Sequence, residues 1–338
     1  MSSARATLTP QMEHYTERLY DDGRLRWLPY VLYFHPYGHR SHVANTDRAG
    51  FRLSRAGDRC ASAAGTVPAG PVNVLAGSSA AFGVGASTDA ATVASRLWAE
   101  HAPARPWLNF GGRSHNSAQE LVLFTLHRHL LPEVREIVLL SGFNNLGLAR
   151  LPDAVQGEHG AFYQVGEFEE KLNGPPGGRR RRRSGGDGGG PAAEGSTAPI
   201  PPAAHQVATA AERTLRHLAG WQLLAGALGA RLSFVLQPLA SWVRDVPAEP
   251  ECRLFAELDE LFSFSEMYGD ITPPAVGRDY SAALRAGCAR LGVPYLDLSP
   301  LLAAAAGPRD WLFVDRAHLT DAGYDLAARL LAGHLGLS

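Results

Sequence analysis

Five short apolar runs, each followed by turn residues and then by a helical pattern, constrain the fold of this chain more than any other feature. The runs are VNVLAG (72–77), PWLNFGG (106–112), EIVLLSG (136–142), RLSFVLQP (231–238) and VPYLDLS (293–299). Segments with helical spacing of apolar residues are 90–100, 118–131, 205–228, 280–291 and 320–335. Strands that alternate with helices form a parallel sheet, and right-handed crossovers place the helices on both of its faces. The pattern predicts an α/β protein, a three-layer α/β/α sandwich around a five-stranded parallel sheet.

Two regions depart from this alternation. Residues 1–70 are rich in Tyr, His, Arg and Gly, so we expect an N-terminal extension packed on the core. Residues 172–203 consist mostly of Gly, Pro, Ala, Ser and Arg, which bury too little apolar surface to offset the entropy of ordering. We expect a disordered insertion there. Its arginine run at 179–183 fits a nucleic-acid or targeting patch or a solvated loop, and the Gly/Pro surroundings favour the loop.

Composition indicates which partners and which cellular compartment to expect. Charged residues make up 19% of the 338 residues and the formal net charge is −1, so no global field attracts nucleic acid or an anionic membrane. The three cysteines are widely spaced and form no CxxC or Cys/His cluster, which fits a reducing compartment and predicts neither a metal site nor a cofactor. Residues 1–20 lack the apolar stretch of a signal peptide. We therefore expect a cytoplasmic protein with no nucleic-acid or membrane partner.

Three segments place chemically useful residues where an open α/β sheet binds its ligands, at the carboxyl ends of strands or beside them. The first, GSSAAFGVGAS (77–87), follows the first strand and carries Ser78 and Ser79. It lacks the lysine of a phosphate-binding P-loop, and its later glycines come too far after the strand for a dinucleotide fingerprint. Glycine and serine are common turn residues, so this segment alone is also typical of a loop.

The other two segments are SGFNNLG (141–147), after the third strand, and DWLFVDRAHLTDAG (310–323), before the last helix. Asp315 and His318 are three residues apart, which allows His318 to take a proton from a serine while Asp315 orients the ring. Asn144 offers an amide that donates a hydrogen bond to a developing oxyanion. Taken singly, Asp315 also fits a helix cap, His318 an exposed histidine and the segment 141–147 a turn.

Taken together and in order, these segments resemble the motif blocks of the SGNH hydrolases, also called GDSL esterases. That family has a serine after the first strand, a glycine after the second, Gly-x-Asn-Asp after the third and Asp-x-x-His before the final helix. The corresponding residues are Gly77-Ser78-Ser79, Asn109-Phe110-Gly111, Gly142-Phe143-Asn144-Asn145 and Asp315-Arg316-Ala317-His318. The similarity spans roughly residues 72–151 and 205–335. It implies a flavodoxin-like fold and one domain over 71–338, interrupted by the insertion at 172–203.

The resemblance assigns roles to five residues. It implies that Ser79 is the nucleophile, that His318 is its general base and that Asp315 is the partner of His318. It also implies an oxyanion hole formed by the backbone N–H groups of Ser79 and Ser114 and by the side-chain amide of Asn144. Ser114 stands where the family often has a glycine, and the donor at that position is a backbone N–H group, which serine also has.

Other residues of the blocks are candidates for substrate contact. Ser78, in place of the usual Asp or Gly, is also the alternative nucleophile. Gly111 lies slightly upstream of the expected oxyanion glycine, and Asn145 replaces the usual Asp of the third block. Gln237 follows the fourth strand, where it either points into the crevice or caps the strand. The stretch 34–52, whose phrase 45–52 is similar to one in related hydrolases, fits either a polar lid or an extension held by local hydrogen bonds.

The resemblance implies a serine hydrolase that cleaves a small-molecule ester, the O-acyl group of a carbohydrate or specialised metabolite, through an acyl-enzyme. Release of the acyl group to a second alcohol instead of water makes the same triad an O-acyltransferase. A catalytically weak binding protein with this fold is the third possibility, because the second and third blocks are altered. The presence of Ser79, Asp315 and His318 argues against it.

Overall fold

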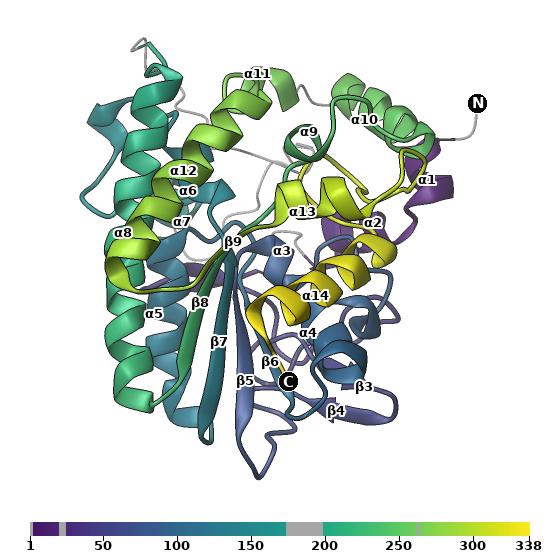
Figure 1. Ribbon diagram of the computed structural model, residues 1–338, viewed down its shortest axis with the longest axis vertical. Helices are drawn as coiled ribbons and strands as arrows, with labels where there is room; N and C mark the ends of the chain where they lie inside the picture. The colour runs from purple at the N-terminus through teal and green to yellow at the C-terminus, as the bar shows by residue number, and fades with distance from the viewer. Residues whose placement is uncertain (1–2, 20–24, 174–198, 262–263) are drawn as a thin grey trace.

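The apolar runs form the five strands of one parallel sheet (Figure 1). The structure, a computed structural model, describes residues 3–19, 25–173, 199–261 and 264–338. The strands are β5 (Val72–Gly77), β6 (Trp107–Gly111), β7 (Val134–Ser141), β8 (Arg231–Leu236) and β9 (Tyr295–Asp297). Their order is β6-β5-β7-β8-β9, so the first strand along the chain lies between the second and the third. This is the order of doubly wound flavodoxin-like sheets, and it confirms the predicted fold class.

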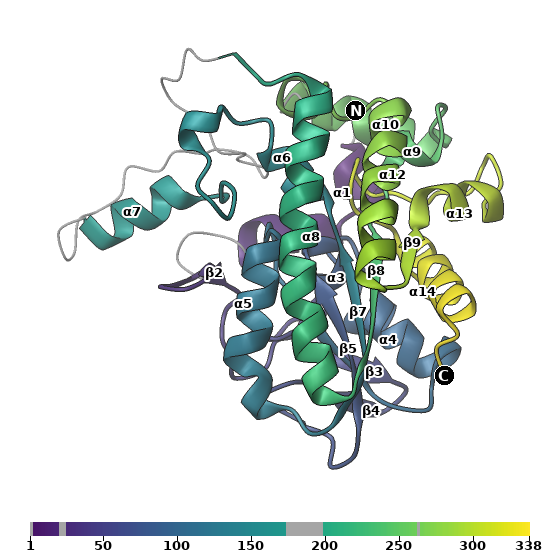
Figure 2. The same ribbon diagram turned by 60° about the vertical axis from the view of Figure 1, so that its left-hand side comes forward.

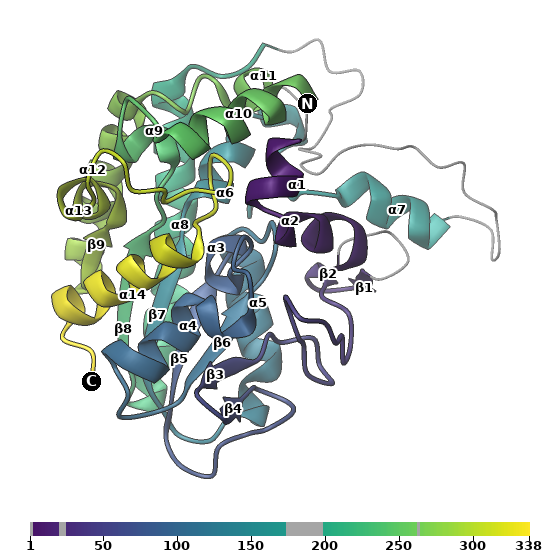
Figure 3. The same ribbon diagram turned by 90° about the vertical axis from the view of Figure 1, so that its right-hand side faces the viewer.

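Helices cover both faces of the sheet (Figures 2 and 3). One face carries α5 (Ser117–His127), α8 (Ala203–Leu228) and α12 (Pro274–Leu291), and the other carries α4 (Val93–Arg96), α13 (Leu298–Ala305) and α14 (Asp321–Leu335). The crossover after β5 therefore uses one face, and the crossover after β6 uses the opposite face. This change creates a topological switch point beside β5, where sheets of this kind bind ligands outside the carboxyl ends of their strands.

The ends of several elements differ from the predicted ones. The last strand ends at Asp297 instead of 299, because the Asp297 carboxylate accepts a hydrogen bond from Ser299 N at 2.9 Å and caps α13, a helix that the pattern did not predict. Helix α12 begins at Pro274 instead of 280, since proline is well suited to the first turn of a helix. The segment 90–100 is divided into α4 and a separate helical turn, Leu97–His101.

Aromatic side chains fill the space between the sheet and its helices. Ring centroids of Phe110 on β6 and Phe124 on α5 are 5.6 Å apart, and those of Phe124 and Trp221 on α8 are 4.8 Å apart. Phe51, from the N-terminal region, lies 4.4 Å from Phe110. Truncation of buried aromatic residues of this kind to alanine typically costs about 3–5 kcal/mol. These contacts join the N-terminal region to the same core.

The N-terminal region contains two short hairpins and a helical arm. The hairpins pair β1 (Arg26–Leu28) with β2 (Leu32–Phe34) and β3 (Ser54–Ala56) with β4 (Arg59–Ala61). The arm consists of α1 (Ala4–Leu8), α2 (Gln11–Glu13) and the helical segment His14–Leu19. Buried Met12 and Tyr15 of the arm pack in one cluster with Phe82 and Val314. This cluster brings the arm against the segments that follow β5 and precede the last helix (Figure 3).

Residues 174–198, with most of the predicted insertion and its arginine run at 179–183, lie outside the described residues. At the edges of this gap, α7 (Val165–Asn173) ends and α8 begins at Ala203. In the described part of the chain, no helix combines the length and the apolar character needed to cross a bilayer.

A buried carboxyl group on α5 makes stability depend on pH. Glu120 is 2% exposed and accepts a hydrogen bond from Ser141 Oγ at 2.7 Å. Burial raises the pKa of Glu120 from 4.5 to about 8, because the ionised carboxylate loses its hydration there. The folded protein therefore holds a proton at Glu120 that the unfolded chain releases at lower pH.

Glu120→Gln is expected to weaken this pH dependence. The contribution of Glu120 to the free energy of unfolding is fully present below its ordinary pKa of 4.5 and is lost as pH rises toward about 8. Glutamine stays neutral, so urea unfolding between pH 5 and pH 8 should show the variant gaining stability relative to wild type as pH rises. The exposed substitution Glu133→Gln serves as the control. A constant difference between Glu120→Gln and wild type over this range would contradict the prediction.

Candidate active site

The carboxyl ends of three adjacent strands lie at one level. Gly77 of β5 is paired with Gly111 of β6 and with Leu140 of β7. The loops that follow β5, β6 and β7 therefore start side by side. They carry Ser79, Ser114 and Asn144, which are brought to the switch point from separate parts of the chain.

Two glycines allow the helix that starts at Ser79 to lie close to the sheet. Helix α3 (Ser79–Phe82) follows β5 directly, and Gly77 has a φ of +146°. A Cβ at Gly77 would overlap the Leu140 carbonyl, and a Cβ at Gly111 would overlap the backbone of Phe82. The structure thus places Gly111, a predicted substrate contact, at the packing of β6 against α3.

Ser79, His318 and Asp315 form a continuous hydrogen-bonded chain. His318 Nε2 lies 2.8 Å from Ser79 Oγ, and His318 Nδ1 lies 2.7 Å from Asp315 Oδ2. A carboxylate only accepts, so Nδ1 carries the proton and Nε2 is free to accept one from the serine hydroxyl. Ser79 is half-buried.

The carboxylate of Asp315 is stabilised in its charged form. Its Oδ1 accepts hydrogen bonds from the backbone N–H groups of Ala317 at 2.8 Å and His318 at 2.7 Å. Burial opposes ionisation, but the charge and the hydrogen bonds of His318, together with those backbone groups, lower the pKa of Asp315 below its ordinary value. An ionised Asp315 stabilises the positive charge that His318 acquires when it takes a proton.

A buried glutamate holds the segment that leads to Asp315. Glu251 of α10 (Glu249–Leu261) accepts hydrogen bonds from the backbone N–H groups of Leu312 and Phe313, both at 2.9 Å. Its carboxylate is also paired with Arg244 at 2.7 Å. Sequence reasoning missed Glu251, since a single glutamate within a helical pattern does not indicate which loop its carboxylate will reach.

The two further predicted oxyanion donors lie in distinct backbone settings. Ser114 has a φ of +54°, in the left-handed region that favours glycine, which fits its alignment with the family glycine. Asn144 is 7% exposed at the start of α6 (Phe143–Leu148), and its Nδ2 donates to the His115 carbonyl at 2.8 Å. An amide nitrogen carries two hydrogens, so this bond orients Asn144 and leaves one hydrogen for another acceptor.

The other predicted contacts are tied into the protein. Ser78 Oγ donates to Gln237 Oε1 at 2.7 Å, and each of these residues is 1% exposed. Asn145 Nδ2 donates to Ser117 Oγ at 2.6 Å and to Thr214 Oγ1 at 2.5 Å. The serine that contacts His318 is Ser79. The side chains of Ser78 and Asn145 are instead hydrogen-bonded to neighbouring segments of the protein.

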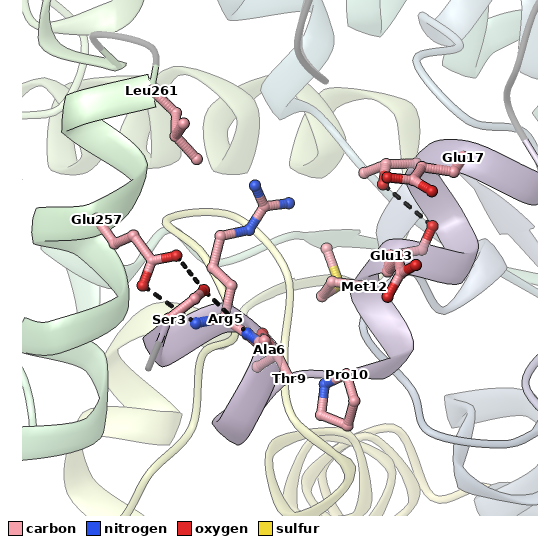
Figure 4. Close-up of a pocket in the computed structure, with 11 residues that line it drawn as sticks. Ser3, Arg5, Ala6, Thr9, Pro10, Met12, Glu13, Glu17, Glu257 and Leu261 are labelled. Atoms are coloured by element: carbon pink, nitrogen blue, oxygen red, sulfur yellow. Dashed lines mark hydrogen bonds between the residues drawn. The ribbon is translucent and has the colours of Figure 1, made fainter. Parts of the chain in front are cut away.

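A cavity of about 320 Å³ lies at the N-terminal arm, between α1, α2 and α10 (Figure 4). Arg5, Glu13, Glu17 and Glu257 supply its charged side chains. The carboxylate of Glu257 accepts hydrogen bonds from Ala4 N at 2.5 Å and Arg5 N at 3.3 Å, which ties α1 to α10. The described residues that line this cavity do not include the Ser79–His318–Asp315 chain, so it is separate from the candidate active site.

One group of described residues has the spacing of metal ligands. Ligand atoms of Glu100, His101 and Asp325 lie within 4.8 Å of one another. Arg96 forms a salt bridge with Glu100 at 2.7 Å and lies 3.9 Å from Asp325, while His101 Nε2 is 2.9 Å from Asp325 Oδ1. Arg96 already pairs with both carboxylates, so the arrangement fits a surface salt-bridge cluster.

Comparison with known proteins shows the family of this chain. The model of the GDSL-like lipase/acylhydrolase family matches residues 75–326, from within β5 to within α14. The chain belongs to this family. It is therefore a GDSL-type hydrolase, an enzyme, as the order of its motifs predicts.

Solved structures of similar proteins share low sequence identity with this GDSL-type hydrolase. A putative acylhydrolase from Bacteroides fragilis is 14% identical, with 79% of this chain and 86% of that chain covered and a TM-score of 0.41. An acetyl xylan esterase, AlAXEase, is 11% identical, with 78% and 98% covered and a TM-score of 0.42. The extracellular lipase of Streptomyces rimosus is 14% identical, with 80% and 100% covered and a TM-score of 0.42. None of the curated proteins matches the chain.

Ser114→Gly tests the backbone strain in this hydrolase. A left-handed conformation costs a residue with a Cβ roughly 1 kcal/mol, and glycine avoids most of that cost. Urea unfolding should show Ser114→Gly to be more stable than Ser114→Ala, which removes the hydroxyl but keeps the Cβ. Equal stability of the two variants would show that a Cβ has no conformational cost at this position, which contradicts the prediction.

Proposed function

We propose that the chain is a serine esterase in which Ser79 is the nucleophile, His318 the general base and Asp315 the residue that orients His318. The hydrogen-bonded chain from Ser79 Oγ through His318 to Asp315 carries this proposal. A serine hydroxyl is a weak nucleophile, and an adjacent base with a fixed tautomer activates it. The proton on His318 Nδ1 leaves Nε2 as the acceptor that this step requires.

In the first step, Ser79 Oγ attacks the ester carbonyl and its proton passes to His318 Nε2. The carbonyl oxygen becomes an oxyanion, which the backbone N–H groups of Ser79 and Ser114 and the amide of Asn144 stabilise. Three observations support these donors: the loops that carry them start from adjacent strands, Ser114 has a glycine-like backbone, and Asn144 is oriented by His115. His318 then protonates the leaving alcohol as the carbon–oxygen bond breaks.

In the second step, water enters where the alcohol left and His318 removes its proton as the water oxygen attacks the acyl-enzyme. The carboxylic acid leaves, and Ser79 regains its proton from His318. If a second alcohol takes the place of water, the same steps produce a new ester and the enzyme acts as an O-acyltransferase. The triad geometry supports both outcomes equally.

We infer that the substrate is a small polar molecule with an O-acyl group, such as an acylated carbohydrate or specialised metabolite. The segments that follow β6 and β7, the strands on either side of the one that leads to Ser79, carry the polar residues Arg113 and Asn144. Arg113 is partly exposed in the loop after β6, next to Ser114. These groups suit a substrate whose alcohol portion forms hydrogen bonds.

Ser79→Ala is expected to abolish release of p-nitrophenol from p-nitrophenyl acetate, because no acyl-enzyme forms without the hydroxyl. Mass spectrometry after treatment with a fluorophosphonate probe should locate the label on Ser79 in the wild-type protein. Ser78→Ala is the matched control and should keep the label on Ser79. Unchanged turnover in Ser79→Ala, or a label on Ser78, would contradict the assignment, and an absence of labelling would favour a binding protein.

Asn144→Ala is expected to lower kcat by about 10²–10³-fold, which is the typical cost of losing one oxyanion donor. The KM should change little, because the donor acts mainly in the transition state. Steady-state kinetics with p-nitrophenyl acetate measures both constants. A kcat equal to that of wild type would remove Asn144 from the oxyanion hole.

A further inference from the structure

Arg52 is a charged side chain that is completely enclosed by the protein. It lies in the N-terminal region, between β2 and β3, and is 0% exposed. A buried guanidinium is costly unless its charge is paired and its N–H groups are bonded. The groups that Arg52 contacts therefore indicate its structural role.

One side of the guanidinium is paired with a buried aspartate. Arg52 Nε donates to Asp89 Oδ1 at 3.0 Å, and Asp89 is 2% exposed. Asp89 also accepts hydrogen bonds from Asn45 N at 3.0 Å and from Asn45 Nδ2 at 2.8 Å. Asp89 therefore balances the charge of Arg52, and the two bonds from Asn45 hold the Asp89 carboxylate in place.

The other side holds the end of the helix that begins at Ser79. Arg52 Nη1 donates to the backbone carbonyls of Phe82 at 3.2 Å and of Gly83 at 2.8 Å. Helix α3 has four residues and ends at Gly83, whose φ is +90°, so these carbonyls have no partner within the helix. A cation at the carboxyl end of a helix is also electrostatically favourable.

Tyr15 completes this arrangement from the N-terminal arm. The single hydrogen of its hydroxyl is shared between the carbonyls of Gly83 at 3.0 Å and Ala86 at 2.8 Å, and the hydroxyl oxygen accepts a hydrogen bond from Arg52 Nη1 at 2.8 Å. Arg52 Nη2 donates to the Val43 carbonyl at 2.9 Å. Two segments of the N-terminal region, which contain Arg52 and Tyr15, thus contact the same single turn of helix.

We propose that Arg52 is a positioning residue for Ser79, with Asp89 and Tyr15 as its supports. Helix α3 consists of one turn, so an anchor on its last carbonyls also sets the position of its first residue. Ser79 Oγ must stay at hydrogen-bond distance from His318 for proton transfer, and small displacements of a reacting group are costly to rate. This inference rests on the proposed role of Ser79 as nucleophile.

The test compares three variants in the full-length protein. Arg52→Lys keeps the charge but loses the planar fork that reaches Asp89 and the α3 carbonyls together. Tyr15→Phe removes only a hydroxyl, so it tests the same anchor if Arg52→Lys does not fold. Leu284→Ala creates a cavity at a buried position of α12, on the α5–α8 face, and controls for general loss of stability.

For each folded variant, kcat and KM for p-nitrophenyl acetate and the rate of fluorophosphonate labelling of Ser79 are measured. Arg52→Lys is expected to lower kcat and the labelling rate by about 10²-fold, because Ser79 moves relative to His318. Tyr15→Phe should lower both by about fivefold, the worth of one hydrogen bond. The KM should stay near the wild-type value in both, and Leu284→Ala should keep the wild-type kcat.

The outcomes separate this inference from the proposed function. If the probe labels Ser79 in wild type and labels Arg52→Lys and Tyr15→Phe equally fast, Arg52 does not position Ser79. The inference also fails if Leu284→Ala loses as much kcat as Arg52→Lys at a matched loss of melting temperature. If wild type itself is not labelled at Ser79, it is the proposed function that fails.

Discussion

The hydrogen bond between Ser79 and His318 is the interaction on which the rest of this structure depends. It joins two residues that are 239 positions apart, so the geometry of the site is decided by how each end is held. Ser79 is held by the parallel register of the sheet, because Gly77 lies opposite Gly111 and Leu140. Ser79 lies two residues beyond the strand, at the first position of α3, so it is confined before any substrate binds.

Each end is supported by an ion pair with a buried member: Arg52 with Asp89, both buried, and Glu251, which is buried, with the partly exposed Arg244. On one side, Arg52 and Asp89 hold the end of α3, and on the other, Glu251 and Arg244 hold the segment before Asp315. Buried pairs are weak sources of net stability, yet loss of one partner costs about 3–5 kcal/mol because the remaining charge is uncompensated. What such pairs do contribute is a fixed geometry, since several N–H groups and carboxylate oxygens must be satisfied together. One pair contacts the helix that begins at Ser79 and the other contacts the segment before Asp315, so both are placed to fix the geometry of the candidate triad.

Much of the fold was predictable because it is encoded locally. Apolar runs of strand length and helical spacing predict the sheet and its layers. Motif order predicts that Ser79 and Asn144 follow strand ends and that His318 precedes the last helix. Roles that depend on tertiary contacts were not predictable. Arg52 and Glu251 are ordinary charged residues in the sequence, and only the fold shows that both are buried against backbone groups of the site. The stretch 34–52 was open between a lid and a tied-down extension, and the bonds of Arg52 show it tied to α3.

The motif positions that differ from the family pattern are accommodated by backbone conformation or by hydrogen-bond partners. Where a position contributes only a backbone N–H group, a side chain is tolerated if the backbone keeps its conformation, as Ser114 does at a φ of +54°. Where the side chain faces the protein, a new partner must satisfy it, as Gln237 does for Ser78 and as Thr214 and Ser117 do for Asn145. The side chains of Ser78 and Asn145 are therefore both hydrogen-bonded within the protein. Ser79 and His318, which are proposed to exchange the proton, keep the family's residue types, as do Asp315, which orients His318, and Asn144.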